Sequence, residues 1–183
     1  MTEVKDIHHT VQANSEHLVT IGLPTYNRPV GLQKCLESIL KQTYSNLEII
    51  ISDNCSTDEA VQNVIKQYAA KDGRIKHFRQ PVNIGLEENF NFVYAKASAD
   101  YFTWMSDDDY FDSNYVEVCV QFLDKNADHV LCSGIAKYYS GKDFLFDERM
   151  FKVEEDTSLK RIFKYFSKAG KNGNFYGVFR NHM

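Results

Sequence analysis

Two hydrophobic patterns alternate along most of this chain. Short continuous runs of apolar and β-branched residues predict buried strands at residues 18–23, 47–52, 75–79, 101–105 and 129–136. Between them, apolar residues recur every three or four positions and predict helices at residues 32–42, 59–69, 86–97 and 115–123. Because strands alternate with helices, we expect an α/β fold: an α/β/α sandwich around a mostly parallel central sheet.

Local signals suggest where several elements begin and end. Pro24 is expected to end the first strand, Ser56 with Glu59 forms a capping-box pattern, and Ser113 can cap the fourth helix. After Ala136 the alternation stops, and Ser140 with Gly141 predicts a hairpin. A helix is expected at residues 159–166 and a final strand at residues 173–179.

The helix expected at residues 159–166 has one basic face. Its cations are Lys160, Arg161, Lys164 and Lys168. A solvated face is the simpler interpretation, and contact with a membrane surface is the alternative that stays open.

Composition narrows the class of protein. The 183 residues suffice for one domain, expected at residues 17–183 after a polar, flexible leader at residues 1–16. A net charge of −4 argues against a protein that wraps nucleic acid, so no nucleic-acid partner is expected. No apolar run is long enough to span a bilayer. Four scattered cysteines without a C-x-x-C pair suit a reducing compartment, so we expect a cytoplasmic location.

Polar clusters follow three of the predicted strands. Residues 25–28 follow the first strand, Asp53 and Asn54 the second, and residues 107–109 the fourth. Parallel strands place these clusters at one edge of the sheet, where α/β proteins bind ligands. Three adjacent aspartates repel one another unless water solvates them or a cation such as Mg²⁺ or Mn²⁺ lies among them. A solvated acidic turn would explain the aspartates alone, but the convergence of three clusters favours a site.

Several common sites are excluded by their missing motifs. The sequence contains no G-x-G-x-x-G, no G-x-x-x-x-G-K-[ST] and no G-x-S-x-G, and its six histidines lack metal-ligand spacing. What remains is an aromatic ring, an aspartate and a carboxylate cluster. A ring can stack on a base, an aspartate can accept a base N–H, and carboxylates can hold a divalent ion against a diphosphate. The sequence therefore predicts a nucleotide-diphosphate site.

Four motifs in order resemble glycosyltransferase family 2, the inverting nucleotide-sugar enzymes with the GT-A fold. They are Pro-Thr-Tyr-Asn-Arg at 24–28, Ser-Asp-Asn-Cys-Ser-Thr-Asp at 52–58, Asn-Ile-Gly at 83–85 and Trp-Met-Ser-Asp-Asp-Asp at 104–109. Each motif is weak alone, but each lies at a strand-to-helix junction. The resemblance covers residues 18–136.

The resemblance implies roles for individual residues toward a nucleotide-sugar donor, most often a UDP-sugar. The base would pack on Tyr26 and donate its N3–H to Asp53. The other residues expected to bind the donor are Pro24, Thr25, Asn27, Arg28, Asn83, Gly85, Asn89 and Asp107. Arg28 either contacts phosphate or only precedes Pro29.

The same resemblance implies a bound Mn²⁺ or Mg²⁺. Asp108 is the expected metal ligand, and Asp109 belongs to the metal site as the residue that orients it. A second register of the family's Asp-x-Asp signature would use Asp107 and Asp109 instead.

The activity implied is transfer of a sugar, with inversion, to a glycan or lipid-linked acceptor in surface polysaccharide synthesis, at the inner face of the membrane. In the family, the base that deprotonates the acceptor lies beyond the sheet core, so we expect it after residue 183 and the acceptor part to be incomplete. Two alternatives stay open. One is a non-catalytic module that binds nucleotide sugars or divalent cations. The other is a sugar-phosphate nucleotidyltransferase, which would need a glycine-rich basic loop where residues 25–29 stand.

Overall fold

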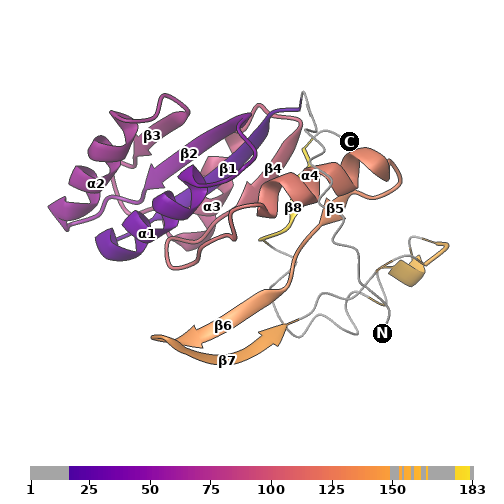
Figure 1. Cartoon of the computed structure of the whole chain (residues 1–183). Coiled ribbons are helices and arrows are strands. Elements are labelled where there is room, and N and C mark those ends of the chain that lie inside the picture. The colour runs from indigo at the N-terminus through magenta and orange to yellow at the C-terminus, as the bar shows by residue number, and fades with distance from the viewer. Residues whose placement is uncertain are drawn as a thin grey trace.

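The computed structural model describes residues 17–148, 153, 155–157, 159–161, 164 and 176–181. Its elements alternate as the hydrophobic pattern predicts (Figure 1). In chain order they are β1 (Val19–Thr25), α1 (Pro29–Leu40), β2 (Leu47–Asp53), α2 (Glu59–Ala69), β3 (Ile75–Arg79), α3 (Leu86–Ala95), β4 (Tyr101–Trp104), α4 (Tyr115–Lys125), β5 (Leu131–Cys132), β6 (Ala136–Ser140), β7 (Asp143–Glu148) and β8 (Val178–Arg180).

Six of the described strands form one sheet in the order β3-β2-β1-β4-β8-β5. The strands β3, β2, β1 and β4 are parallel, and β8 lies antiparallel between β4 and β5. The expected α/β class and mostly parallel sheet are therefore confirmed. The carboxyl ends of β1, β2 and β4 lie at one edge, as the site prediction requires.

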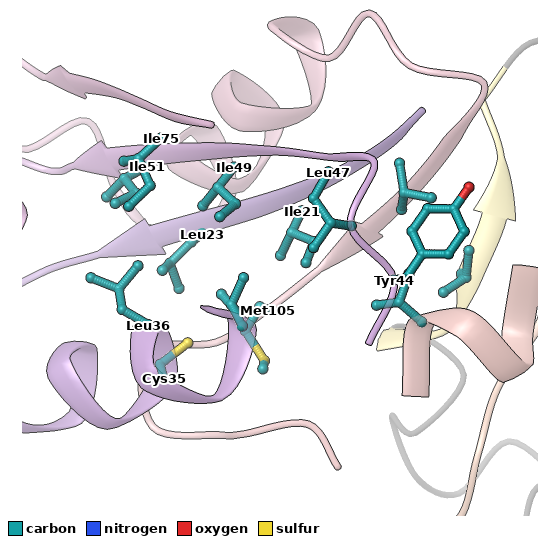
Figure 2. Packing of buried hydrophobic residues seen from close by; sticks show 14 of the residues in the cluster. Ile21, Leu23, Cys35, Leu36, Tyr44, Leu47, Ile49, Ile51, Ile75 and Met105 are labelled. Atoms are coloured by element: carbon teal, nitrogen blue, oxygen red, sulfur yellow. The ribbon is translucent and has the colours of Figure 1, made fainter. Parts of the chain in front are cut away.

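Helices cover both faces of the sheet. Alternate residues of a strand point to opposite faces, so Ile49 and Ile51 join the core under α1, α2 and α4, whereas Ile50 packs with Val93 of α3. Figure 2 shows Leu36 and Cys35 of α1 beneath the strand residues of the larger core. The α/β/α layering follows from strands that are apolar on both faces.

Pro24 does not end β1, contrary to the sequence prediction. Pairing between β1 and β4 stops at Gly22, whose carbonyl accepts from Met105 N at 2.9 Å. Pro24 lies two residues further on and faces the same side, where no partner strand requires an N–H. The strand can therefore continue to Thr25 along β2.

Two predicted helix caps are wrong. The N-cap of α2 is Asp58, which accepts from Ala60 N at 2.9 Å, whereas Ser56 contacts the loop after β1. The N-cap of α4 is Asn114 and not Ser113. In both cases the polar residue nearest the apolar stripe begins the helix, and the earlier serine remains in the loop.

The part of the chain after β4 departs most from the predicted boundaries. The strand expected at residues 129–136 is reduced to β5, and β6 with β7 forms the predicted hairpin, which projects from the body in Figure 1. The strand expected at 173–179 is present as β8, three residues long and antiparallel.

The remaining predictions fall partly or wholly outside the described residues. The leader at 1–16 and most of the helix at 159–166 are among these. Lys160 and Lys164 are described, and they form ion pairs with Asp156 at 2.8 Å and Glu155 at 2.5 Å. Within the described part of the chain, no helix combines the length and apolar character needed to cross a bilayer.

Candidate functional site

The acid loop, residues 106–109, follows β4 and is held directly against the end of β1. Asp107 is buried, and its Oδ2 accepts from Thr25 Oγ1 at 2.8 Å and from Tyr26 N at 3.3 Å. Burial raises the pKa of Asp107, whereas these hydrogen bonds and Arg28 favour its ionised form. The predicted convergence of the loops after β1 and β4 is therefore present.

Helix α1 packs closely against the backbone of the acid loop. A Cβ placed on Gly31, in the first turn of α1, would lie 2.3 Å from the Asp107 carbonyl oxygen. Only glycine allows the helix and the loop backbone to approach this closely. This contact could not be predicted, because Gly31 lies inside an ordinary helical pattern.

Arg28 joins two carboxylates of the acid loop. Its Nη1 donates to Asp107 Oδ1 at 3.2 Å and to Asp108 Oδ2 at 2.6 Å. The two carboxylates raise the pKa of the guanidinium. Asp108 also accepts from the Ser106 hydroxyl, and its side chain is 57% exposed. Asp108 is therefore accessible from solvent, whereas the neighbouring Asp107 is buried.

Asp109, the last residue of the acid loop, interacts electrostatically with two tyrosines from the later part of the chain. Partial burial and the charges of Asp108 and Asp107 raise the pKa of Asp109. The Tyr176 phenol hydrogen-bonds to Ser106, and burial and the Asp109 charge raise its pKa. The pKa of Tyr138, in β6, is raised by its own burial, by Glu148 and by Asp109. Sequence reasoning missed both tyrosines, which lie far along the chain and outside every motif.

The acid loop fits a divalent cation in its donor chemistry. Oxygens of Asp107 and Asp108 converge on one cationic atom, Arg28 Nη1, which marks a point where both carboxylates meet positive charge. Among the described residues, no group of three or more His, Cys, Asp or Glu is arranged to hold a metal ion. Mg²⁺ typically takes one or two carboxylates and completes its shell with substrate phosphate and water. The residues present match that partial set.

Asp53 is placed at the expected edge but its carboxylate is covered. It is fully buried, and it accepts from Ser56 N at 2.9 Å and from Gln62 Nε2 at 2.5 Å. Arg79 Nε lies 3.7 Å from the same carboxylate. A base N–H would have to compete with these partners for the Asp53 carboxylate. Tyr26, by contrast, is 41% exposed and open to stacking.

Asn27 ties the loop after β1 to the loop after β2. Its Oδ1 accepts from Thr57 N at 2.8 Å and from Asp58 N at 3.0 Å, and its own N donates to Ser56 Oγ at 2.9 Å. Its φ of 53° lies in the left-handed region that asparagine tolerates better than most residues. The geometry gives Asn27 a structural role in the site.

The Asn-Ile-Gly turn is attached to β2 through Asn54. Asn54 Nδ2 donates to Asn83 Oδ1 and to the Gly85 carbonyl, both at 3.0 Å, and its Oδ1 accepts from Ile84 N at 2.8 Å. The role of Asn54 as a connector between these loops was not predicted from the sequence.

Asn89 is buried on α3 and bonded to Ser52. Its Oδ1 accepts from Ser52 Oγ at 2.6 Å, and its Nδ2 donates to the Ser52 carbonyl at 3.0 Å. This pairing anchors α3 to β2.

Pro24 lies within β1, where its register partner is Ser52.

The structure thus brings Thr25, Tyr26, Arg28, Asp107 and Asp108 into direct contact. Of the other predicted donor residues, Asn27, Asn83 and Gly85 lie in the surrounding loops, which are connected through Asn27 and Asn54. Pro24 and Asp53 lie in strands and Asn89 lies in α3. A buried acid, an exposed acid, a guanidinium and an exposed aromatic ring share one sheet edge. That set suits an anionic ligand with an aromatic base.

Comparisons with known proteins agree with this geometry. The profile of glycosyl transferase family 2 matches residues 20–182. The GalNAc(5)-diNAcBac-PP-undecaprenol beta-1,3-glucosyltransferase of Campylobacter jejuni is 30% identical over 173 residues, which are 90% of this chain and 52% of that enzyme. The chain therefore spans about half the length of this relative.

Two solved structures share the fold. TarS of S. aureus, residues 1–349 in complex with UDP-GlcNAc, superposes with a TM-score of 0.66 at 18% identity, over 90% of this chain and 45% of that one. The mannosyltransferase PcManGT of Pyrobaculum calidifontis, in complex with GDP-Man and Mn²⁺, gives a TM-score of 0.54 at 20% identity, over 58% of this chain and 32% of that one. The GT-A fold expected from the sequence is confirmed. With a family profile that matches nearly the whole chain, this chain belongs to glycosyl transferase family 2.

Proposed function

We propose that the sheet edge around Asp107 and Asp108 binds a nucleotide-diphosphate sugar, with UDP as the favoured nucleotide and Mn²⁺ or Mg²⁺ as the cation. The observation that carries the proposal is the direct hydrogen bonding of the acid loop to Thr25, Tyr26 and Arg28. It gathers an aromatic ring, a cation and two carboxylates at one edge. The structures with UDP-GlcNAc and with GDP-Man and Mn²⁺ support the ligand class.

Each residue has a stated task in this proposal. Tyr26 stacks on the base, and Asp53 accepts the base N3–H after Gln62 moves aside. Asp107 lies near the ribose, and Asp108 is the metal ligand, with Asp109 orienting the metal site. Pro24, Thr25, Asn27, Asn83, Gly85 and Asn89 shape the pocket through the loop contacts described above.

The reaction proposed is a single displacement at the anomeric carbon. A base takes the proton of the acceptor hydroxyl, that oxygen bonds to the anomeric carbon, and the bond to the nucleoside diphosphate breaks. When bound, the metal neutralises charge on the departing diphosphate. The protein holds the donor between Tyr26 and the acid loop.

The acceptor proposed is a glycan or a lipid-linked oligosaccharide at the cytoplasmic face of a membrane. The support is the name of the Campylobacter relative, which acts on an undecaprenol-linked glycan. This part of the proposal concerns the whole protein and is independent of the donor site.

Calorimetry with UDP and Mn²⁺ tests the donor site. We expect UDP to bind in the presence of Mn²⁺ and Asp108→Asn to weaken that binding at least tenfold, because the substitution removes one charged metal ligand. Asp128→Asn is the matched control. Asp128 is exposed and precedes β5, so it lies at the amino ends of the parallel strands, away from the acid loop at their carboxyl ends. Equal UDP binding by wild type and Asp108→Asn would refute the donor site.

A further inference from the structure

Arg28 occupies an unusual position at the start of α1. It is the N-cap residue, and Pro29 follows at the first helical position. The backbone at this point is fixed by the proline and by the Leu32 N–H bond to the Arg28 carbonyl at 2.9 Å. The side chain is 56% exposed, so its guanidinium is partly in solvent and can change partners there.

One nitrogen of this guanidinium holds both carboxylates of the acid loop. Arg28 Nη1 lies 2.6 Å from Asp108 Oδ2 and 3.2 Å from Asp107 Oδ1. The carboxylate proposed to bind a divalent cation therefore already has a cationic partner. A metal ion bound to Asp108 would lie close to this guanidinium, and the two positive charges would repel each other.

We propose that Arg28 is a positioning residue that exchanges partners: it neutralises Asp107 and Asp108 in the empty site and moves to the donor diphosphate when the divalent cation binds. This inference rests on the proposed function, because it requires both ligands at the same edge. A guanidinium suits the role, since its planar fork pairs with carboxylate and with phosphate alike.

The exchange has two consequences that can be measured. The divalent cation alone binds weakly, because it must displace Arg28 from Asp108. UDP strengthens metal binding, because its diphosphate accepts the released guanidinium, and by thermodynamic reciprocity the metal strengthens UDP binding by the same factor. Removing the guanidinium should therefore strengthen binding of the divalent cation alone and reduce the coupling between cation binding and UDP binding.

The experiment compares wild type, Arg28→Gln and Arg28→Lys by calorimetry with Mn²⁺ alone, UDP alone, and UDP at saturating Mn²⁺. For Arg28→Gln we expect Mn²⁺ alone to bind about fivefold more tightly, the size of one partly exposed ion pair. We expect UDP at saturating Mn²⁺ to bind more weakly than to wild type. Arg28→Lys retains the charge and should fall between the two.

Arg74→Gln is the matched control, because Arg74 pairs with Asp72 at 2.8 Å in a turn before β3. This turn lies at the amino ends of the parallel strands, away from the acid loop at their carboxyl ends. Thermal unfolding verifies that each variant is folded. If folded Arg28→Gln binds Mn²⁺ alone with unchanged or lower affinity while wild type binds Mn²⁺ and UDP, the exchange is refuted and the donor site stands. If wild type binds neither ligand, the donor site itself is wrong.

Discussion

At the scale of single residues, the side chains of the proposed site are bonded to one another through the acid loop, where Asp107 accepts from Thr25, Tyr26 and Arg28. Tyr26, Arg28, Asp107 and Asp108 meet as expected, because their motifs lie at the ends of parallel strands. The burial of Asp53 under Gln62 could not be predicted, since it depends on the packing of α2 against the loop. Motifs report residue types, whereas hydrogen-bond partners are decided by tertiary packing.

Gly31 is the residue whose size the site depends on most directly. In Gly31→Ala the new methyl group would lie 2.3 Å from the Asp107 carbonyl oxygen, so the loop or the helix must shift. We expect a loss of about 1–3 kcal/mol in the free energy of unfolding, despite the better helix propensity of alanine. We also expect weaker Mn²⁺-dependent UDP binding. Chemical denaturation and calorimetry measure the two effects.

Gly73→Ala serves as the control for this substitution, because a Cβ at Gly73 meets nothing within 4 Å. Equal stability and equal UDP binding in wild type and Gly31→Ala would show that the acid loop does not depend on the approach of α1.

Asn27 offers a second test at this scale. Asn27→Ala removes the acceptor for two backbone N–H groups at the start of α2 and leaves a strained φ of 53°. We expect a loss of about 1–3 kcal/mol in the free energy of unfolding. Asn27→Asp keeps an acceptor oxygen near the N-terminus of α2 and should recover most of the loss. If both variants match wild type in denaturation midpoint, the loop connection is not stabilising.

At the scale of elements, the hydrophobic pattern located every helix and strand up to β4 and failed mainly in strand partners and caps. β8 inserts antiparallel between β4 and β5, which a local pattern cannot reveal because pairing involves residues far apart in the chain. The length of β1 was underestimated because Pro24 is harmful only where a neighbouring strand needs its N–H.

Tyr101, the first residue of β4, connects β4 with α4 and β8. We expect its ionisation to lower the stability of the folded protein at alkaline pH. Its hydroxyl donates to Asp124 at 2.7 Å and accepts from Arg180 Nη1 at 3.0 Å, which joins β4, α4 and β8. Burial and the bond to Asp124 raise its pKa to about 12. The unfolded chain ionises near the ordinary value of 10, so this contribution is complete below about pH 10 and is lost as the pH rises toward 12.

The check is the difference in unfolding free energy between wild type and Tyr101→Phe, measured from pH 8 to pH 12. We expect wild type to be more stable at pH 8 and the difference to shrink above pH 10. A difference that stays constant over this range would mean that Tyr101 ionises as easily in the folded protein as in the unfolded chain, and a difference that grows would mean that it ionises more easily in the folded protein.

At the scale of the whole molecule, the proposed donor site combines three loops that are distant in the sequence, and the parallel sheet brings them to one edge. The motifs between residues 24 and 109 identify this edge, and the family profile extends over residues 20–182. Tyr176, which hydrogen-bonds to Ser106, and Tyr138, whose pKa the Asp109 charge raises, carry no recognisable motif. The meeting of the loops after β1 and β4 could therefore be predicted, and the interactions of these two tyrosines with the acid loop could not.

The most direct test of the donor site is a crystal structure of the chain with UDP and Mn²⁺, with the metal located by its anomalous scattering. We expect a manganese peak at coordination distance from Asp108 and the uracil ring stacked on Tyr26. A manganese ion bound away from the acid loop, or a uracil ring on another face of the molecule, would contradict it.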